Sequence, residues 1–442
     1  MKAAVIGLGV EGKKAVKSFL KHGWEVYATD LNSNIDLSDL ELPIAPIDLI
    51  NDEQSISIVS EKFTVDLGFS NSYAIEKCDA IAISPSMFGG AFADRLLKDG
   101  NLVCDVVDSH KKIFTIGITG TNGKTTTVHM LKSILENAGK KVLVGGNGGG
   151  GFSGYYDLIL EASEGDYDVL LVEVCDMTLN FCDYCFDFDM IGLTNIGNDH
   201  MDVHKTIANY KDSLVKFFSG KTIFTAFNQD FNSDFKSAAI KTIPFFEYND
   251  EIKLVGKFNL LNAGLATAIA RELKVSKGII RETLTDFKAI RGRLDVYKIN
   301  NASVYVGKTD NSDALESILS EMDFYAIFIG TPRANEKHRL DILDAAVKYN
   351  PEVIVLFPGL DDTLDVALYR INSLGYDGTI LTVNSLDEII ELVAEYSHED
   401  AILIGGNGQK AITDIQERIK LISEKLWCIS LTKILYILLY SV

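Results

Sequence analysis

Residues 115–131 read TIGITGTNGKTTTVHML, and this stretch decides how the rest of the chain is interpreted. An apolar, strand-like run breaks into the loop Gly-Thr-Asn-Gly-Lys-Thr-Thr and resumes with helical spacing at Val128, Leu131 and Ile134. A strand, a glycine-containing loop and a helix in this order predict a phosphate-binding loop. The commonest form, G-x-x-x-x-G-K-[ST], has a glycine where this chain has Ile118. The sequence therefore predicts a shorter variant of this loop.

Each polar group of the loop has an expected role. We expect Lys124 to reach the β- and γ-phosphates of a nucleotide and the Thr125 hydroxyl to ligate Mg²⁺. Backbone N–H groups at residues 121–124 would form the anion cradle. The predicted nucleotide-binding residues are Gly120, Thr121, Asn122, Gly123, Lys124, Thr125 and Thr126.

Polar residues also follow two later strand patterns. Glu173 ends the apolar run VLLVE, where a carboxylate can hold a metal ion across the sheet from the loop. The run TNIGNDHMDVH places further candidates after another strand: Asn195, Asp199, His200 and His204. Taken singly, Glu173 also fits an acid at a helix N-terminus and His200 a hydrogen-bonded loop histidine. Together they predict a metal site of Thr125, Glu173 and His200.

A second glycine loop stands near the N-terminus. Residues 7–12 read GLGVEG after a strand pattern and before a helical one, and Asp30 ends the next strand pattern. Gly7 would make the tight turn, Gly9 would let a diphosphate approach, and Gly12 would let helix and strand pack closely. This pattern fits a dehydrogenase, a domain that holds the diphosphate of a nucleotide-linked substrate, or a glycine turn without a ligand.

The chain of 442 residues predicts more than one domain, and its hydrophobic content of 47% is globular. Strand and helix patterns alternate throughout, with early strands expected at 80–86 and 102–107. We expect three tandem doubly wound α/β domains. They are a Rossmann-like domain at 1–109, a P-loop ATPase domain at 110–293 and a Rossmann-like domain at 294–442.

The bulk chemistry excludes several classes of function. A net charge of −20 disfavours binding to nucleic acid or to an anionic membrane. The apolar tail at 426–442 is interrupted by Lys433, so we expect a packed segment or an interface rather than a membrane span. The chain starts with a strand pattern at 2–6 rather than a signal peptide, and its six cysteines are scattered. Both features favour a reduced, cytoplasmic protein. We expect the protein to be a monomer.

Six motifs in order give the chain a resemblance to a known family: TGTNGKTTT, VEVCDMT, NIGNDHMD, FNQD, GKFNLLNA and RGRLDV. The chain resembles the Mur ligases and their folylpolyglutamate synthetase relatives over nearly its whole length. The resemblance implies an enzyme that uses ATP and Mg²⁺ to join a carboxylate to an amine through an acyl phosphate. It implies a UDP-linked peptide or acid as one substrate, bound by the first domain, and an amino acid as the other, bound by the third.

The resemblance also implies residue roles. Lys124 and Thr125 would serve the phosphates and Mg²⁺, with Glu173 and His200 at the metal ions. Asn259 and Asn262 would lie by the adenine, Arg293 near the phosphates, and Lys308 in the catalytic site of the third domain. Gly7, Gly9, Gly12 and Asp30 would bind the nucleotide-linked substrate.

Some positions depart from the family pattern. Many Mur ligases have a carbamylated lysine at the position that Leu214 occupies here, between Lys211 and Lys216. Gly307 stands where the family pattern has an aspartate, and Lys308 or Asp310 would take over the contact of that aspartate. The run GGNGGGGFSGY at 145–155 is similar to archaeal ligases associated with pseudomurein. The open alternatives are a ligase of cofactor polyglutamates, the nickel-tetrapyrrole ring-closing synthetase of methanogens, an NAD-dependent dehydrogenase, and an inactive homologue.

Overall fold

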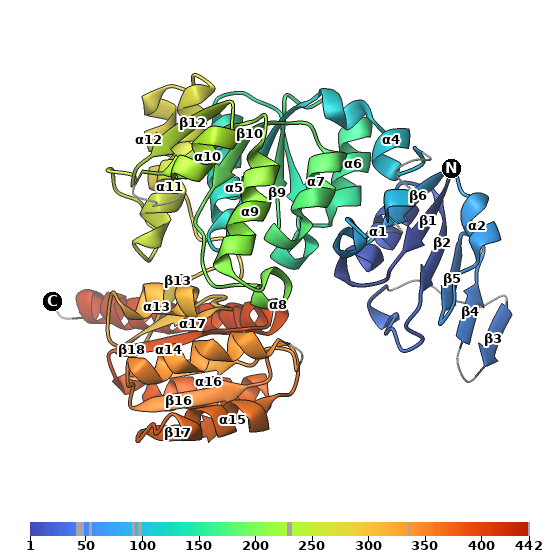
Figure 1. Cartoon of the computed structure of the whole chain (residues 1–442). Helices are drawn as coiled ribbons and strands as arrows, with labels where there is room; N and C mark the ends of the chain where they lie inside the picture. The colour runs from blue at the N-terminus through green and yellow to red at the C-terminus, as the bar shows by residue number, and fades with distance from the viewer. Residues whose placement is uncertain are drawn as a thin grey trace. The chain divides into compact units, whose positions relative to one another are not determined.

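The computed structural model describes residues 1–40, 48–52, 55–90, 93–95, 100–227, 232–334 and 336–440. Its strands form three six-stranded sheets, coloured blue, green and orange to red along the chain (Figure 1). The chain divides into two compact units. One comprises residues 1–195, 208–248 and 262–283, and the other comprises residues 196–207, 249–261 and 284–442. The segment 196–207 thus groups with the third sheet, although the sequence boundaries assign it to the central domain.

The first sheet has the strand order β3-β4-β5-β2-β1-β6. Its strands are β1 (Lys2–Ile6), β2 (Glu25–Asp30), β3 (Asp48–Asp52), β4 (Ser55–Val59), β5 (Phe63–Leu67) and β6 (Ala80–Ile83). β1 pairs in parallel with β2 and β6, and β2 in parallel with β5, whereas β3, β4 and β5 are antiparallel. The antiparallel edge follows from connections of two or three residues, which are too short for a parallel crossover.

The helices of this part include α1 (Val10–Lys21), which buries Ala15, Val16 and Phe19. This part also contains η1 (Ser38–Leu40), α2 (Ser72–Glu76), η2 (Pro85–Met87) and α4 (Val103–Val106). The strand predicted at 102–107 is therefore wrong, because only Leu102 bridges to Ile81 and the chain then makes one helical turn.

The second sheet is entirely parallel, with the order β12-β11-β10-β7-β9-β8. Its strands are β7 (Phe114–Thr119), β8 (Val142–Gly146), β9 (Val169–Glu173), β10 (Phe188–Leu193), β11 (Thr222–Ala226) and β12 (Lys241–Phe245). The central strands β7 and β9 are buried along almost their whole length, as expected for parallel strands covered on both faces.

The turn η3 (Ser109–Lys112) leads into β7. The helical segments between and after the strands are α5 (Lys124–Asn137), η4 (Gly148–Gly150), α6 (Tyr155–Glu164), η5 (Asp176–Thr178), α7 (Leu179–Cys185), α9 (Ile207–Phe218), α10 (Asn232–Ala238), α11 (Phe258–Glu272) and α12 (Lys277–Asp286). The short helix α8 (Met201–His204) belongs to the other unit.

The third sheet has the order β13-β14-β18-β15-β16-β17. Its strands are β13 (Asp295–Ile299), β14 (Ala302–Val306), β15 (Ala326–Gly330), β16 (Val353–Phe357), β17 (Thr379–Thr382) and β18 (Ala401–Gly406). Only the β13–β14 pair is antiparallel, and β13 has no counterpart in the sequence prediction. The helical segments are α13 (Ser312–Leu319), η6 (Lys337–Leu340), α14 (Asp341–Lys348), α15 (Leu364–Ser373), α16 (Leu386–Glu395), η7 (Tyr396–His398) and α17 (Gln409–Tyr440).

Two apolar clusters, one on each face, form the core of this sheet. The mixed α/β architecture of three sheets confirms the predicted fold class. Among the described residues, no helix combines the length and apolar character that crossing a bilayer requires.

Candidate active site

The predicted phosphate loop connects β7 to α5, in the middle of the second sheet. Gly120 and Gly123 both adopt positive φ, at 120° and 85°. A Cβ atom on Gly120 would lie 2.3 Å from Thr194 Oγ1, and one on Gly123 would lie 2.2 Å from Asn262 Oδ1. Lys124 donates from Nζ to the carbonyl oxygens of Gly120 (2.7 Å) and Thr121 (2.8 Å), so its ammonium lies over the loop.

Asn195 holds this loop from the neighbouring strand end. Its Oδ1 accepts from Asn122 N (3.0 Å), its Nδ2 donates to Asn122 O (3.0 Å), and its backbone carbonyl accepts from Thr121 N (3.0 Å). These three bonds leave little freedom at the tip of the loop. The sequence placed Asn195 among the polar candidates that follow this strand, and in the structure it clamps the phosphate loop.

Thr125 and Glu173 meet beside the loop. Thr125 Oγ1 donates to Glu173 Oε2 at 2.6 Å, and Asn147 Nδ2 donates to Glu173 Oε1 at 3.1 Å. Glu173 is 1% exposed, and its carboxylate faces the N-terminus of α5. A hydroxyl and a carboxylate brought together in this way are hard oxygen donors, so the pair fits Mg²⁺.

Asn262 joins the same surroundings from α11. Its Oδ1 lies 3.4 Å from Thr127 Oγ1 and fills the space beside Gly123. Thr126 is buried in the first turn of α5. The structure thus brings together the loop residues, Glu173 and Asn262 within one compact unit.

The first glycine loop connects β1 to α1. Gly7 has φ 88°, and a Cβ atom on Gly12 would lie 1.8 Å from Gly7 O, so the turn and the close packing both require glycine. A Cβ atom on Gly9 would meet nothing within 4 Å. Asp30 accepts from the backbone N–H groups of Leu8 (2.7 Å) and Asn32 (2.9 Å), so its carboxylate fixes the loop.

His200 lies in the second compact unit, at the start of α8, with φ 51°. Its Nε2 is 3.8 Å from Asp199 Oδ2, and its backbone N–H donates to Asp199 Oδ1 (2.9 Å). Asp199 in turn accepts from Arg339 Nη2 (3.2 Å) and from Asn311 Nδ2 (3.3 Å). This carboxylate is therefore neutralised within the unit by a buried guanidinium.

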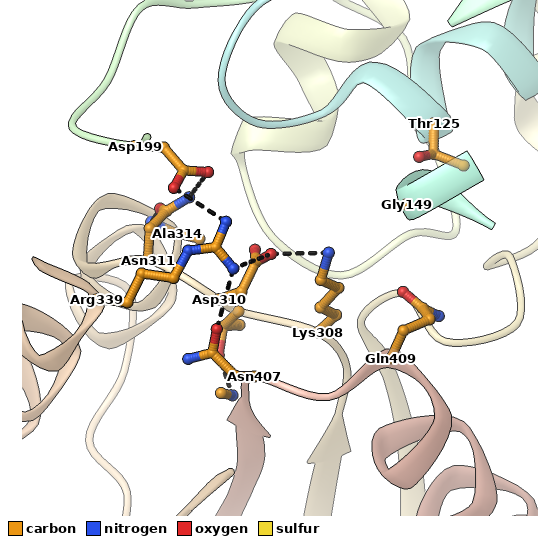
Figure 2. A network of polar contacts seen from close by, with 12 residues as sticks. Thr125, Gly149, Asp199, Lys308, Asp310, Asn311, Ala314, Arg339, Asn407 and Gln409 are labelled. Atoms are coloured by element: carbon orange, nitrogen blue, oxygen red, sulfur yellow. Dashed lines mark hydrogen bonds and ion pairs between the residues drawn. The ribbon is translucent and has the colours of Figure 1, made fainter. Parts of the chain in front are cut away.

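Arg339 is the centre of a polar network at one edge of the third sheet. Figure 2 shows its guanidinium between Asp199 and Asp310, with Asn407 on its other side. Lys308 and Asp310 follow β14, Asn407 follows β18, and Arg339 follows β15 in η6, and these three strands are parallel. Carboxyl ends of parallel strands meet at one edge, which is the usual ligand side of such sheets.

Asp310 is largely buried, with 16% of its side chain exposed, and Lys308 Nζ lies 2.7 Å from its Oδ2. Burial alone would raise the pKa of the Asp310 carboxyl, but the charges of Lys308 and Arg339 outweigh burial and hold this pKa well below its usual range. Arg293, half-buried nearby, acts in the same direction. Asp310 is therefore a carboxylate at any physiological pH.

Gly307 stands where the family resemblance predicts an aspartate. A Cβ atom here would lie 2.4 Å from Leu294 Cα, so this strand end accepts only glycine. Leu214, in the slot of the carbamylated lysine, is fully buried on α9. At both positions the residue that departs from the family pattern therefore fits its tightly packed surroundings.

The remaining predicted residues are also placed. Asn259 is buried and donates from Nδ2 to Val255 O (2.6 Å) in the second unit. Arg293 accepts from Gln416 Nε2 through its carbonyl oxygen (2.8 Å). The FNQD motif extends beyond the described residues, with Asn228 and Asp230 outside them.

Sequence reasoning missed Asn147 and Arg339 as polar residues of these sites. Asn147 was visible only as part of a glycine-rich run, and Arg339 follows no recognisable motif. Its partner Asp199 is 140 positions away in the chain, a separation that no local pattern bridges.

Comparisons with known proteins agree with this architecture. Residues 118–232 match the model of the Mur ligase middle domain. The chain is 28% identical over 353 residues to the UDP-N-acetylmuramoylalanine–D-glutamate ligase of Alkaliphilus metalliredigens, covering 71% of this chain and 73% of that protein.

Two solved structures are similar in fold. A pseudomurein peptide ligase type C from Methanothermus fervidus has a TM-score of 0.54 and 20% identity, covering 95% of this chain and 99% of that chain. FolC from E. coli in complex with ADP has a TM-score of 0.59 and 17% identity, covering 74% and 94%.

The fold and the loop define a multidomain α/β protein built around a phosphate-binding loop in a parallel sheet. Within that class, the chain is similar to Mur ligases, because residues 118–232 match the Mur ligase middle domain and a curated Mur ligase is similar over 71% of the chain, which agrees with the resemblance that the sequence motifs predicted.

Proposed function

We propose that this protein is an ATP-dependent ligase that forms an amide bond between a carboxylate and an amine through an acyl phosphate. The observation that carries the proposal is the contact between Thr125 and Glu173 at 2.6 Å, directly beside the Lys124 loop, in a region that matches the Mur ligase middle domain. The similar FolC structure holds ADP, which supports ATP as the nucleotide.

Lys124 and the N–H groups of the loop bind the nucleotide phosphates, where a fixed positive charge opposes the charge developing on the transferred phosphoryl group. Thr125 and Glu173 would hold Mg²⁺. The ion supplies charge neutralisation between the phosphates. Asn195 and Asn262 keep the loop in shape, so that little reorganisation is needed when the nucleotide binds.

The acid substrate is a nucleotide-linked cell-wall peptide precursor, held by its diphosphate at the first glycine loop. The open space at Gly9 and the N-terminus of α1 support this assignment. Because Asp30 is engaged by two backbone N–H groups, its role here is to shape the loop. The relative from Alkaliphilus metalliredigens acts on a UDP-linked muramoylalanine, which makes a murein precursor the first acid to test and a pseudomurein precursor the second.

The amine substrate is an amino acid bound at the carboxyl edge of the third sheet. Lys308 and Arg339 supply positive charge there, and Asp310 and Asp199 supply negative charge. An amino acid carries both charges, so this edge offers partners for its carboxylate and its ammonium.

The test is release of phosphate from ATP by the purified chain against a panel of UDP-linked acids and amino acids, beginning with UDP-N-acetylmuramoyl-alanine and D-glutamate. We expect release only when Mg²⁺, an acid and an amino acid are all present, with a new amide product of matching mass. Failure of every acid–amine pair to stimulate release would refute the proposal.

A further inference from the structure

We propose that Glu11 and Lys14 of α1 are positioning residues that fix the metal-site carboxylate of Glu173 through the glycine-rich segment, residues 145–154. The inference rests on the proposed function in one respect, namely that the pair of Thr125 and Glu173 binds Mg²⁺ with a nucleotide. It gives a physical role to a glycine run that the sequence shows but does not explain.

Two charged side chains of α1 hold the glycine-rich segment. Glu11 Oε1 accepts from Gly148 N at 2.5 Å, and Lys14 Nζ donates to Gly148 O at 2.9 Å. Lys14 Nζ also donates to Phe152 O. One residue of the segment, Gly148, thus has both backbone polar groups held by two charged side chains of a single helix.

Asn147 connects the glycine-rich segment to Glu173. Asn147, adjacent to Gly148, donates from its backbone N–H to Glu173 O (3.0 Å) and from Nδ2 to Glu173 Oε1 (3.1 Å). Asn147 Oδ1 accepts from Gly149 N (3.1 Å), which fixes the orientation of the amide. The Glu173 carboxylate therefore has one oxygen on Thr125 and the other on Asn147.

The glycines follow from these contacts. A Cβ atom on Gly148 would lie 2.7 Å from Lys14 Cδ and 2.8 Å from Glu11 Oε1. A Cβ atom on Gly150 would lie 1.9 Å from Glu173 Oε1. Because α1 occupies one side of the segment and the Glu173 carboxylate the other, a side chain at these positions would displace one of them.

Burying the charged side chains of Glu11 and Lys14 costs free energy, and the hydrogen bonds that both make to Gly148 offset part of this cost. Glu11 Oε2 is buried, and burial raises the pKa of this carboxyl while the Gly148 N–H and Lys14 lower it in part. Charge-assisted bonds of this kind are stronger than neutral ones. A packing contact alone would not need two opposite charges on one helix.

The first glycine loop opens α1, so that loop and the metal site are joined by a short series of contacts. The series runs from α1 through Gly148 and Asn147 to Glu173. Loosening it should change the geometry of the metal ligand and leave the phosphate loop, which Asn195 clamps separately, intact.

The experiment measures binding of ADP to the full chain by calorimetry, with Mg²⁺ titrated against the ADP complex and with EDTA in a parallel series. For Glu11→Ala we expect the affinity for Mg²⁺ to fall at least fivefold, while binding of ADP in EDTA stays within twofold of wild type. Lys14→Met, which keeps the aliphatic stem, should give the same selective loss. Glu11→Gln retains an oxygen that accepts from Gly148 N and should restore Mg²⁺ affinity to within twofold.

The matched control is Lys21→Ala. Lys21 is on the same helix and pairs with Asp157 and Glu161 of α6, but not with the glycine-rich segment. It should leave both affinities unchanged. The inference would be overturned if Glu11→Ala and Lys14→Met both bound Mg²⁺ with wild-type affinity. It would also be overturned if these variants lost as much affinity for ADP in EDTA as they lost for Mg²⁺. Absence of ADP binding by wild type would instead count against the proposed function.

Discussion

Lys124 is the residue on which nucleotide chemistry depends most directly. Its ammonium lies on the carbonyl oxygens of the loop and on no core group, so Lys124→Ala should leave the fold unchanged. We expect phosphate release to fall at least 100-fold, or about 2.7 kcal/mol of barrier, because the positive charge facing the transferred phosphoryl group is lost. Circular dichroism and a phosphate-release assay test this, and near wild-type release would mean that the loop is not the ATP site.

Leu214 predicts an enzyme that works without a carbamylated lysine. Its side chain is fully buried, and a leucine offers no oxygen to a metal ion. Removing CO₂ and bicarbonate from the assay should leave the rate unchanged, and Lys211→Ala and Lys216→Ala should each cost less than tenfold, or under about 1.4 kcal/mol. An inactive Lys211→Ala that short-chain carboxylates rescue would show that Lys211 occupies the carbamate position.

At the scale of elements, η6 supplies the guanidinium that joins three strand ends of the third sheet. Arg339→Met leaves Asp310 and Asp199 without this buried partner, and breaking such a pair costs roughly 3 to 5 kcal/mol. Hydrogen exchange of the β14 and β18 amides measures the loss. Arg370→Met, which breaks an exposed pair with Asp344, is the control and should change little.

The stability that Arg339→Met removes should depend on pH in one definite direction. The depressed pKa of Asp310 stabilises the fold above the ordinary aspartate pKa of 3.8, and this stabilisation disappears as pH falls through the lower folded value. The difference between wild type and Arg339→Met should therefore be full at pH 7 and narrow below about pH 4. An equal difference at both pH values would show that the arginine acts by packing alone.

The turn η3, which leads into β7, gives a second pH-dependent element. His110 is buried, and its Nε2 lies 2.7 Å from Cys185 O, so the ring donates there. Burial lowers its pKa from the ordinary 6.5, so the unfolded chain binds the proton more readily and stability falls as pH drops below about 6.5. His110→Gln should remove this part of the slope of melting temperature between pH 7.5 and 5, whereas His398→Gln, at an exposed site, should not.

At the scale of the whole molecule, sequence predicted what is local and missed what is distant. The strand–loop–helix around Lys124 and the fold class were predictable because hydrophobic period and glycine placement are properties of neighbouring residues. The error at 102–107 arose because a short apolar run fits a strand and a helical turn equally well.

The unpredicted part of the site consists of long-range contacts. Asp199 and Asn195 read as one polar loop, yet Asn195 clamps the phosphate loop while Asp199 pairs with Arg339 in the other unit. The glycines at 148 and 150 are explained by Glu11, Lys14 and Glu173, which lie far away in the chain. Such pairings depend on the tertiary fold, so no local pattern contains them.

The central claim is that this chain activates a carboxylate with ATP, and oxygen-isotope transfer tests it most directly. The acid that supports phosphate release is labelled with ¹⁸O in its carboxylate, and the released phosphate is analysed by mass spectrometry. Formation of an acyl phosphate predicts one ¹⁸O atom in each phosphate, delivered when the amine displaces it. Phosphate that carries no label, released together with the amide product, would contradict the account.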